Sequence, residues 1–218
     1  MTNIDWYFRN PRLAPRPAEG LSQLYFLRRD IDTCFGTDPN TGVLWQTIDK
    51  RTGTDIYCKA IWPGTMAILA GIDMLGKFLV GTDKTRGPGK ITVGDRFKAF
   101  TTRYFGLNDT DAGLLYQLRN SMLHSFGLYS EEQDSQGKIK STYNFILTLG
   151  TDKLVKHIKD DYYQIDAQCL REYFEISITK YEAELRDVSQ QGNKELNDKF
   201  NAMFPKHAKP MLFQIKRA

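Results

Sequence analysis

Apolar residues recur at every third or fourth position through most of this chain, a spacing that places them on one face of an α-helix. The pattern predicts six helices: Leu21–Phe35, Ile61–Val80, Asp95–Phe105, Asn108–Phe126, Asp166–Val188 and Asn193–Phe204. The segment 61–80 is apolar on every side, as expected of a helix buried in a core. It is long enough to span a membrane, but Asp73 and Lys77 within it favour a core helix.

The period changes after Gly127, where apolar and polar residues begin to alternate as they do in β-strands. We expect a β-hairpin over about residues 125–149, with strands at 125–130 and 139–149, and a further short strand at Tyr162–Ile165. The sequence therefore predicts a mainly α-helical bundle. A small β-hairpin or sheet is expected as an elaboration after the helix 108–126.

The helices and the hairpin are assigned to one predicted domain, residues 21–205, because a chain of 218 residues suits a single domain. Residues 1–20 are rich in proline and arginine and are expected to form an extended N-terminal arm. The segment 36–59 carries many turn-forming residues and is expected to be an irregular connection. Residues 206–218 form a basic C-terminal tail, which is expected to be loose.

Composition and charge narrow the class of protein only slightly. The chain has 41% hydrophobic and 26% charged residues, which is typical of a globular domain. Its net charge of +4 permits a polyanionic partner without requiring one, since the basic residues are scattered. The three cysteines, Cys34, Cys58 and Cys169, stand far apart and indicate reduced thiols. With no apolar signal segment at the N-terminus, we expect a cytoplasmic protein without membrane association.

No metal site and no cofactor are expected. His157 and His207 stand outside any set of Cys, Asp and Glu residues with the spacing of a zinc site. The glycine-rich segment Gly81–Thr92 fails the spacing of a phosphate-binding P-loop, because Lys84 stands where that motif requires its first glycine.

The segment 118–124, with the sequence LRNSMLH, brings together the most chemically capable side chains of the chain. At about 100° per residue, Arg119 lies on the flank of an apolar stripe that faces the core. Asn120 and His124 share a face that points away from this stripe, with Tyr116 one turn earlier. The stripe itself comprises Leu115, Leu118, Met122 and Phe126.

Two charged residues of these helices need partners, because an unpaired buried charge is costly. Arg119 leans toward the bundle and requires an anionic or carbonyl partner. Asp73 stands in the apolar helix 61–80, where either Lys77 at i+4 or Arg119 of a neighbouring helix can pair with it. The local pair with Lys77 is slightly favoured.

The motif resembles the signature of the HEPN superfamily, in which an Arg is followed by four to six residues and a His, most often with a polar residue directly after the Arg. Arg119 to His124 matches the four-residue form, and Asn120 is the polar residue. The segment Ile68–Lys77 is similar to the companion helix of bacterial proteins of this kind. The likeness covers 61–80 and 95–126, a third of the chain or less, and implies an all-α bundle.

In its catalytically active members the resemblance implies a metal-independent ribonuclease site. His124 would take the proton from an RNA 2′-hydroxyl or protonate the leaving 5′-oxygen. Arg119 would bind the scissile phosphate, and Asn120 would orient the phosphate or His124. Asp73 and Tyr116 would support these catalytic residues.

The resemblance also predicts partners. His124 points outward, so a second copy of the same helix, related by a two-fold axis, would cover it and form a homodimer. RNA is the expected substrate. Because such bacterial domains are associated with toxin–antitoxin and anti-phage systems, an antitoxin-like protein is a further expected partner.

The alternative is a non-catalytic HEPN-like dimerisation or scaffold module in which the same residues hold the dimer together. No dense patch of Lys, Arg and aromatic residues accompanies the motif, which counts against RNA cleavage. The state of His124 distinguishes the two hypotheses. A catalytic histidine requires a groove open to a phosphate, and a structural one is buried with its hydrogen bonds satisfied.

Overall fold

The computed structural model describes residues 2–12, 21–45, 47–48, 51–52, 55–56, 59–85, 90–187, 189 and 191–208. Its helices are α1 (Asn3–Tyr7), α2 (Gln23–Cys34), α3 (Ile61–Val80), α4 (Val93–Phe100), the π-helical turn η1 (Thr101–Phe105), α5 (Asp109–Ser125), α6 (Ala167–Arg186) and α7 (Gln191–His207). Its strands are β1 (Thr47–Ile48), β2 (Asp55–Ile56), β3 (Tyr129–Gln133), β4 (Ile139–Thr148), β5 (Val155–Lys159) and β6 (Tyr162–Asp166). Residues 13–20 of the expected arm, Cys58 and residues 209–218 of the expected tail lie outside this description.

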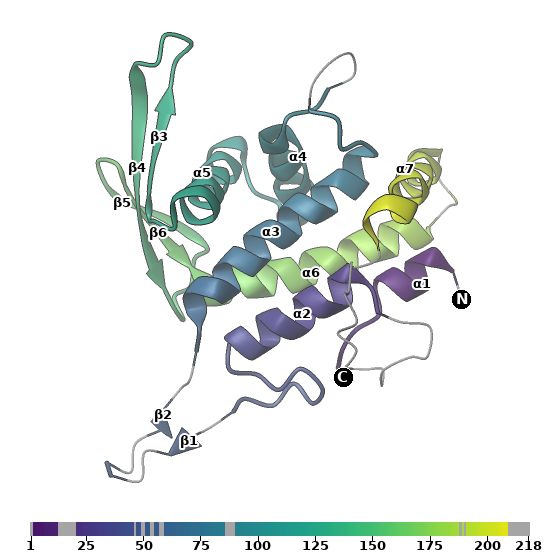
Figure 1. Cartoon of the computed structure of the whole chain (residues 1–218), viewed down its shortest axis with the longest axis horizontal. Coiled ribbons are helices and arrows are strands. Elements are labelled where there is room, and N and C mark those ends of the chain that lie inside the picture. Colours follow the sequence, from purple (N-terminus) through teal and green to yellow (C-terminus); the bar gives the residue numbers. More distant parts are fainter. Residues whose placement is uncertain are drawn as a thin grey trace, which may run out of the picture.

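Helix α3 lies at the centre of the helical part, where it packs against α2, α4, α5, α6 and α7 (Figure 1). Five of its apolar side chains are wholly buried: Ile68, Leu69, Ile72, Leu75 and Phe78. Among the described residues α3 alone is long and apolar enough to cross a membrane, yet 56% of its apolar window is buried inside the fold. Burial on this scale is consistent with the core helix of a soluble protein.

Helix α5 carries the Arg119–His124 motif and begins as the sequence predicts. The side chain of its N-cap residue Asn108 accepts a hydrogen bond from the backbone N–H of Asp111. The helix ends at Ser125, because Phe126 adopts a left-handed conformation with φ of 51°. Phe126 is therefore 72% exposed and does not continue the buried stripe, contrary to the prediction.

The expectation of a mainly α bundle with a small hairpin is wrong, because the fold is α+β. A four-stranded mixed sheet in the order β3-β4-β6-β5 stands beside α5 and α6 (Figure 1). β4 pairs with β3 and β5 pairs with β6 in antiparallel fashion, whereas β4 and β6 are parallel. The inward face of the sheet buries Phe145 and Ile165 against the helices. β5 was missed because Lys156, His157 and Lys159 give it no clear alternation.

The N-terminal residues are part of the core and not only an extended arm. Thr2 and Asp5 form a reciprocal capping box that starts α1. Ile4, Tyr7 and Phe8 are buried in the same apolar core as α3. At the other end, α7 continues to His207, so the first residues of the expected tail are helical.

Candidate functional site

The site forms where the middle of α3 meets the second half of α5. The Arg119 Nε atom donates to Oδ2 of Asp73 at 2.7 Å, and Nη2 lies 2.5 Å from the same oxygen. The two side chains are only 14% and 12% exposed. Asp73 therefore forms its ion pair with Arg119, and the prediction that favoured Lys77 is wrong. Because the two opposite charges are paired between the helices, neither is buried without a partner.

Burial and nearby cations have opposite effects on the pKa of Asp73. Burial raises the pKa of Asp73 above its ordinary value, and the opposing attraction of Arg119, Arg96 and Lys77 offsets this only in part. The Oδ1 atom of Asp73 is buried without a hydrogen-bond partner in the described part of the chain. A buried pair of this kind contributes little net stability, but it fixes the orientation of the guanidinium.

The remaining amino group of Arg119 reaches the other two motif residues. Its Nη1 atom donates to Oδ1 of Asn120 at 3.2 Å and lies 2.7 Å from Nε2 of His124. Arginine is always a donor, so Nε2 of His124 must act as the acceptor, and the proton of the neutral imidazole sits on Nδ1. Arg119, Asn120 and His124 are thus brought together as the sequence predicts.

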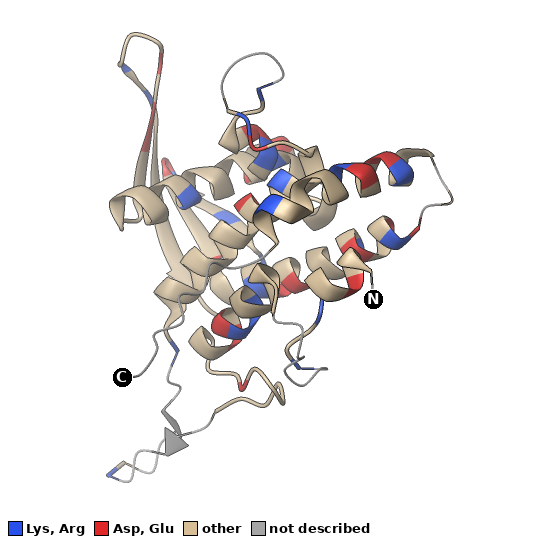
Figure 2. Cartoon of the chain, turned by 45° about the vertical axis from the view of Figure 1, so that its right-hand side comes forward, with Lys and Arg blue, Asp and Glu red and all other residues tan. Residues whose placement is uncertain are grey.

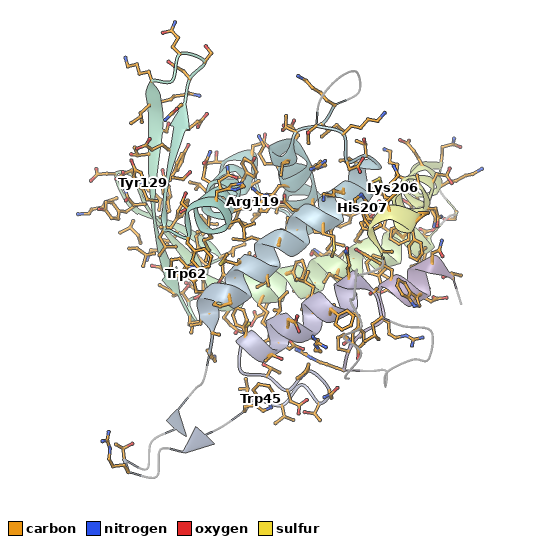
Figure 3. All side chains as sticks on the ribbon, in the orientation of Figure 1. Trp45, Trp62, Arg119, Tyr129, Lys206 and His207 are labelled. Carbon is orange, nitrogen blue, oxygen red and sulfur yellow. The ribbon has the colours of Figure 1, made fainter. Side chains whose placement is uncertain are left out.

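His124 is exposed at the mouth of an open hollow of about 400 Å³, which we call the motif hollow. Its lining comes from the end of α5 and from the neighbouring strand β3: Asn120, Ser121, His124 and Ser125, with Tyr129, Ser130 and Glu131. Arg119 lies between α5 and α3, and Tyr129 lies on the side of the sheet (Figure 3). Arg119 does not line the hollow itself, and its guanidinium is linked to it through the contacts of Nη1 with Asn120 and His124.

Tyr116 does not line the motif hollow. It packs on α4, with its ring centroid 5.7 Å from that of Phe97 and its ring edge against Gly94. The supporting role predicted for Tyr116 is therefore not backed by any contact with the motif hollow among the described residues.

The residues of β3 are the part of the site that sequence reasoning missed. The chain reverses at Phe126 and Gly127, and β3 returns along α5, where the Ser130 hydroxyl donates to Oε1 of Gln117 at 2.8 Å. Ser121 anchors the reversal by donating to the Gly127 carbonyl oxygen at 2.6 Å. The sequence signal that could have predicted this is the short link between α5 and β3, from Ser125 to Tyr129, which keeps the strand close to the helix.

The charges around the site are mixed. The carboxylate of Glu131 accepts a hydrogen bond from the Tyr129 hydroxyl at 2.6 Å and lines the hollow with it. Over the described residues, basic and acidic side chains are interspersed along the same helices (Figure 2). No set of three or more His, Cys, Asp and Glu residues with the geometry of a metal site occurs in the described ranges. The site therefore offers one fixed guanidinium, one imidazole and one amide.

Comparison of the chain with protein-family models, with curated proteins and with solved structures finds no match.

Proposed function

We propose that this protein is a metal-independent RNA endonuclease whose site resembles that of the HEPN superfamily. The observation that supports the proposal is the 2.7 Å contact between Nη1 of Arg119 and Nε2 of His124 at an open hollow. A guanidinium binds phosphate through paired N–H donors, and an imidazole transfers protons near neutral pH. Together they provide the two functions that phosphodiester cleavage by a 2′-hydroxyl requires.

Arg119 is the phosphate-binding residue of the proposed mechanism. Asp73 engages Nε and Nη2 and thereby holds the guanidinium plane in place, and Nη1 contacts His124, which lines the motif hollow. A phosphate oxygen entering there replaces His124 as the acceptor of the Nη1 proton. This exchange releases the Nε2 lone pair of His124 at the moment when substrate is bound.

His124 then acts as the proton-transfer residue. Nε2 takes the proton from the 2′-hydroxyl, whose oxygen attacks phosphorus and forms a 2′,3′-cyclic phosphate. The bond from phosphorus to the 5′-oxygen breaks, and that oxygen takes a proton to leave as a hydroxyl. Asn120 lies beside both groups and orients the phosphate through its amide.

The dimer is part of the proposal because His124 is the one histidine that a described subunit places at the motif hollow. While His124 of one copy accepts a proton, a second copy placed across the end of α5 supplies the acid for the leaving group. The exposed side chain of Phe126 directly follows this end of the helix and offers apolar area for such a contact. By the same resemblance we place the protein in the cytoplasm with an antitoxin-like partner.

One observation favours the scaffold alternative. The Nε, Nη1 and Nη2 atoms of Arg119 all have partners within the same subunit, namely Asp73, Asn120 and His124. A structural cluster would show the same closure. The experiment therefore measures chemistry and assembly together.

The test is cleavage of total RNA in EDTA by the wild type, Arg119→Ala and His124→Ala, with light scattering of each. Arg29→Ala and His207→Ala are matched controls, because Arg29 pairs with Asp30 and His207 with Asp83, and neither side chain lines the motif hollow. We expect the wild type and both controls to cleave and both motif variants to lose at least a hundredfold in rate while remaining dimers. If no form cleaves RNA and only the motif variants fail to dimerise, the nuclease hypothesis is wrong and the scaffold hypothesis takes its place.

A further inference from the structure

A second hollow lies against α5 toward the start of the helix, with a volume of about 470 Å³. We call it the aromatic hollow, because three tyrosines from three elements line it: Tyr116 of α5, Tyr143 of β4 and Tyr163 of β6. The rings of Tyr143 and Tyr163 lie 6.0 Å apart between centroids, and all three tyrosines are half-buried. The ring of His157 stacks on that of Tyr163 at 5.1 Å between centroids, so one face of Tyr163 is already covered. The remaining exposed parts of the half-buried rings are apolar surface that a flat ligand can contact.

The two hollows adjoin along α5. Gln117 lines the aromatic hollow, Ser130 lines the motif hollow, and the two side chains share a hydrogen bond of 2.8 Å. From Gln117 to His124 the helix rises by about 10 Å. Neighbouring nucleotides of one strand can span this distance.

Polar groups at the walls of the aromatic hollow match the edge of a nucleobase. The Gln117 carbonyl oxygen is used by Ser130, which leaves the amide NH₂ of Gln117 as a donor. Glu132 accepts from the Tyr143 hydroxyl at 3.0 Å and keeps further acceptor capacity. A donor and an acceptor on the walls of one hollow suit a base with an exocyclic amino group, since carboxylates accept from such groups.

Charge decides which part of a nucleotide enters. Asp109 and Glu132 line the aromatic hollow, and Glu132 forms an ion pair with Lys140 at 3.4 Å, so repulsion of a phosphate from the interior comes chiefly from Asp109. Lys98 lies at its wall as an exposed ammonium that makes no ion pair within the described part of the chain. An uncharged base inside the hollow avoids the repulsion, and a phosphate at Lys98 pairs with the ammonium.

We propose that the aromatic hollow binds the base of a nucleotide next to the scissile phosphate of single-stranded RNA. The proposal rests on the proposed function, because that function places the scissile phosphate at Arg119 and His124. Stacking on aromatic side chains is the usual source of affinity for single-stranded nucleic acid, and it works without a dense basic patch. The hollow thereby selects unpaired RNA and a base that carries an amino group.

Gly113 provides the test, because it lines the aromatic hollow and a Cβ built on it meets no atom within 4 Å. Gly113→Met fills the hollow with a flexible side chain, and Gly113→Ala is the control that leaves most of it open. Binding is measured by fluorescence anisotropy with labelled 2′-O-methyl RNA oligonucleotides, which lack the attacking hydroxyl and cannot be cleaved. Circular dichroism shows whether each variant is folded.

We expect Gly113→Ala to bind like the wild type and Gly113→Met to bind about tenfold more weakly. Lys98→Gln weakens binding by a smaller factor, and an oligonucleotide of uracil alone binds more weakly than one of cytosine. Equal binding by Gly113→Met and Gly113→Ala would overturn the proposal, and so would a wild type that binds no oligonucleotide. Cleavage of unmodified RNA is a separate readout: a wild type that binds but does not cleave contradicts the nuclease and leaves the base-binding result standing.

Discussion

Arg119 is held from three directions within one subunit, by Asp73 on α3 and by Asn120 and His124 on its own helix. The contacts differ in what they do. Asp73 compensates a charge that is mostly removed from water, whereas His124 is an exposed acceptor that a ligand can replace. At the residue scale, the site is therefore a fixed cation with one exchangeable contact.

Removal of Asp73 is expected to cost more than removal of a carboxylate at the surface. Asp73→Ala leaves the largely buried Arg119 without its counter-charge, and we expect a loss of about 2 kcal/mol in the free energy of unfolding. The control is Asp30→Ala, which breaks only the exposed pair with Arg29 and is expected to change stability by less than about 0.5 kcal/mol. Urea unfolding measures both, and equal losses would contradict the compensating role of Asp73.

At the level of elements, α4 and β3 pack around α5 and, with Tyr143 of β4 and Tyr163 of β6, form the two hollows. α4 supplies Lys98 and supports Tyr116, and β3 contributes to both hollows. α4 can approach α3 because Gly76 has no side chain. A Cβ there would lie 2.8 Å from the carbonyl oxygen of Arg96, which is backbone and cannot rotate away.

Two glycine-to-alanine substitutions are expected to have opposite effects. Gly76→Ala forces α3 and α4 apart and is expected to lower the free energy of unfolding by about 1–3 kcal/mol. Gly113→Ala, also inside a helix but facing open space, is expected to raise it by up to about 1 kcal/mol through helix propensity. Denaturant unfolding of both proteins gives the sign directly, and a stabilising Gly76→Ala would show that the two helices do not need this close approach.

At the scale of the whole molecule, the two ends of the described chain meet. The ring of Tyr7 lies 4.8 Å from that of Phe78 on α3 and 5.5 Å from that of Phe200 on α7, measured between centroids. Tyr7 is fully buried, and its hydroxyl has no hydrogen-bond partner in the described ranges. The N-terminal helix thus completes the core at the cost of one unsatisfied polar atom.

Tyr7 allows the aromatic ring and the hydroxyl to be tested separately. Tyr7→Ala removes the ring from the core and is expected to lower the free energy of unfolding by about 3–5 kcal/mol. Tyr7→Phe keeps the ring and removes the unpartnered hydroxyl, so we expect it to raise the free energy of unfolding by up to about 1 kcal/mol. Thermal and urea unfolding measure both variants, and a tolerated Tyr7→Ala would favour the original expectation that residues 2–8 belong to an extended arm.

Local patterns in the amino-acid sequence were enough to locate the main helices and the motif on α5. The 3.6-residue period of α3 and the capping residue Asn108 are local signals, read from neighbours within one or two turns. The order Arg119, Asn120, His124 places three capable groups on adjoining faces of one helix, which also needs no tertiary information. The site residues of α5 were therefore predictable.

The contacts between distant segments could be learned only from the folded chain. The Asp73–Arg119 pair, the parallel pairing of β4 with β6 and the burial of Tyr7 join residues that are far apart in the chain. Such contacts follow from how all the apolar faces can be buried together, and the local period of any one segment does not contain that information. For the same reason the sequence predicted a histidine on an outer helix face, but only the return of β3 along α5 made that face one wall of a hollow.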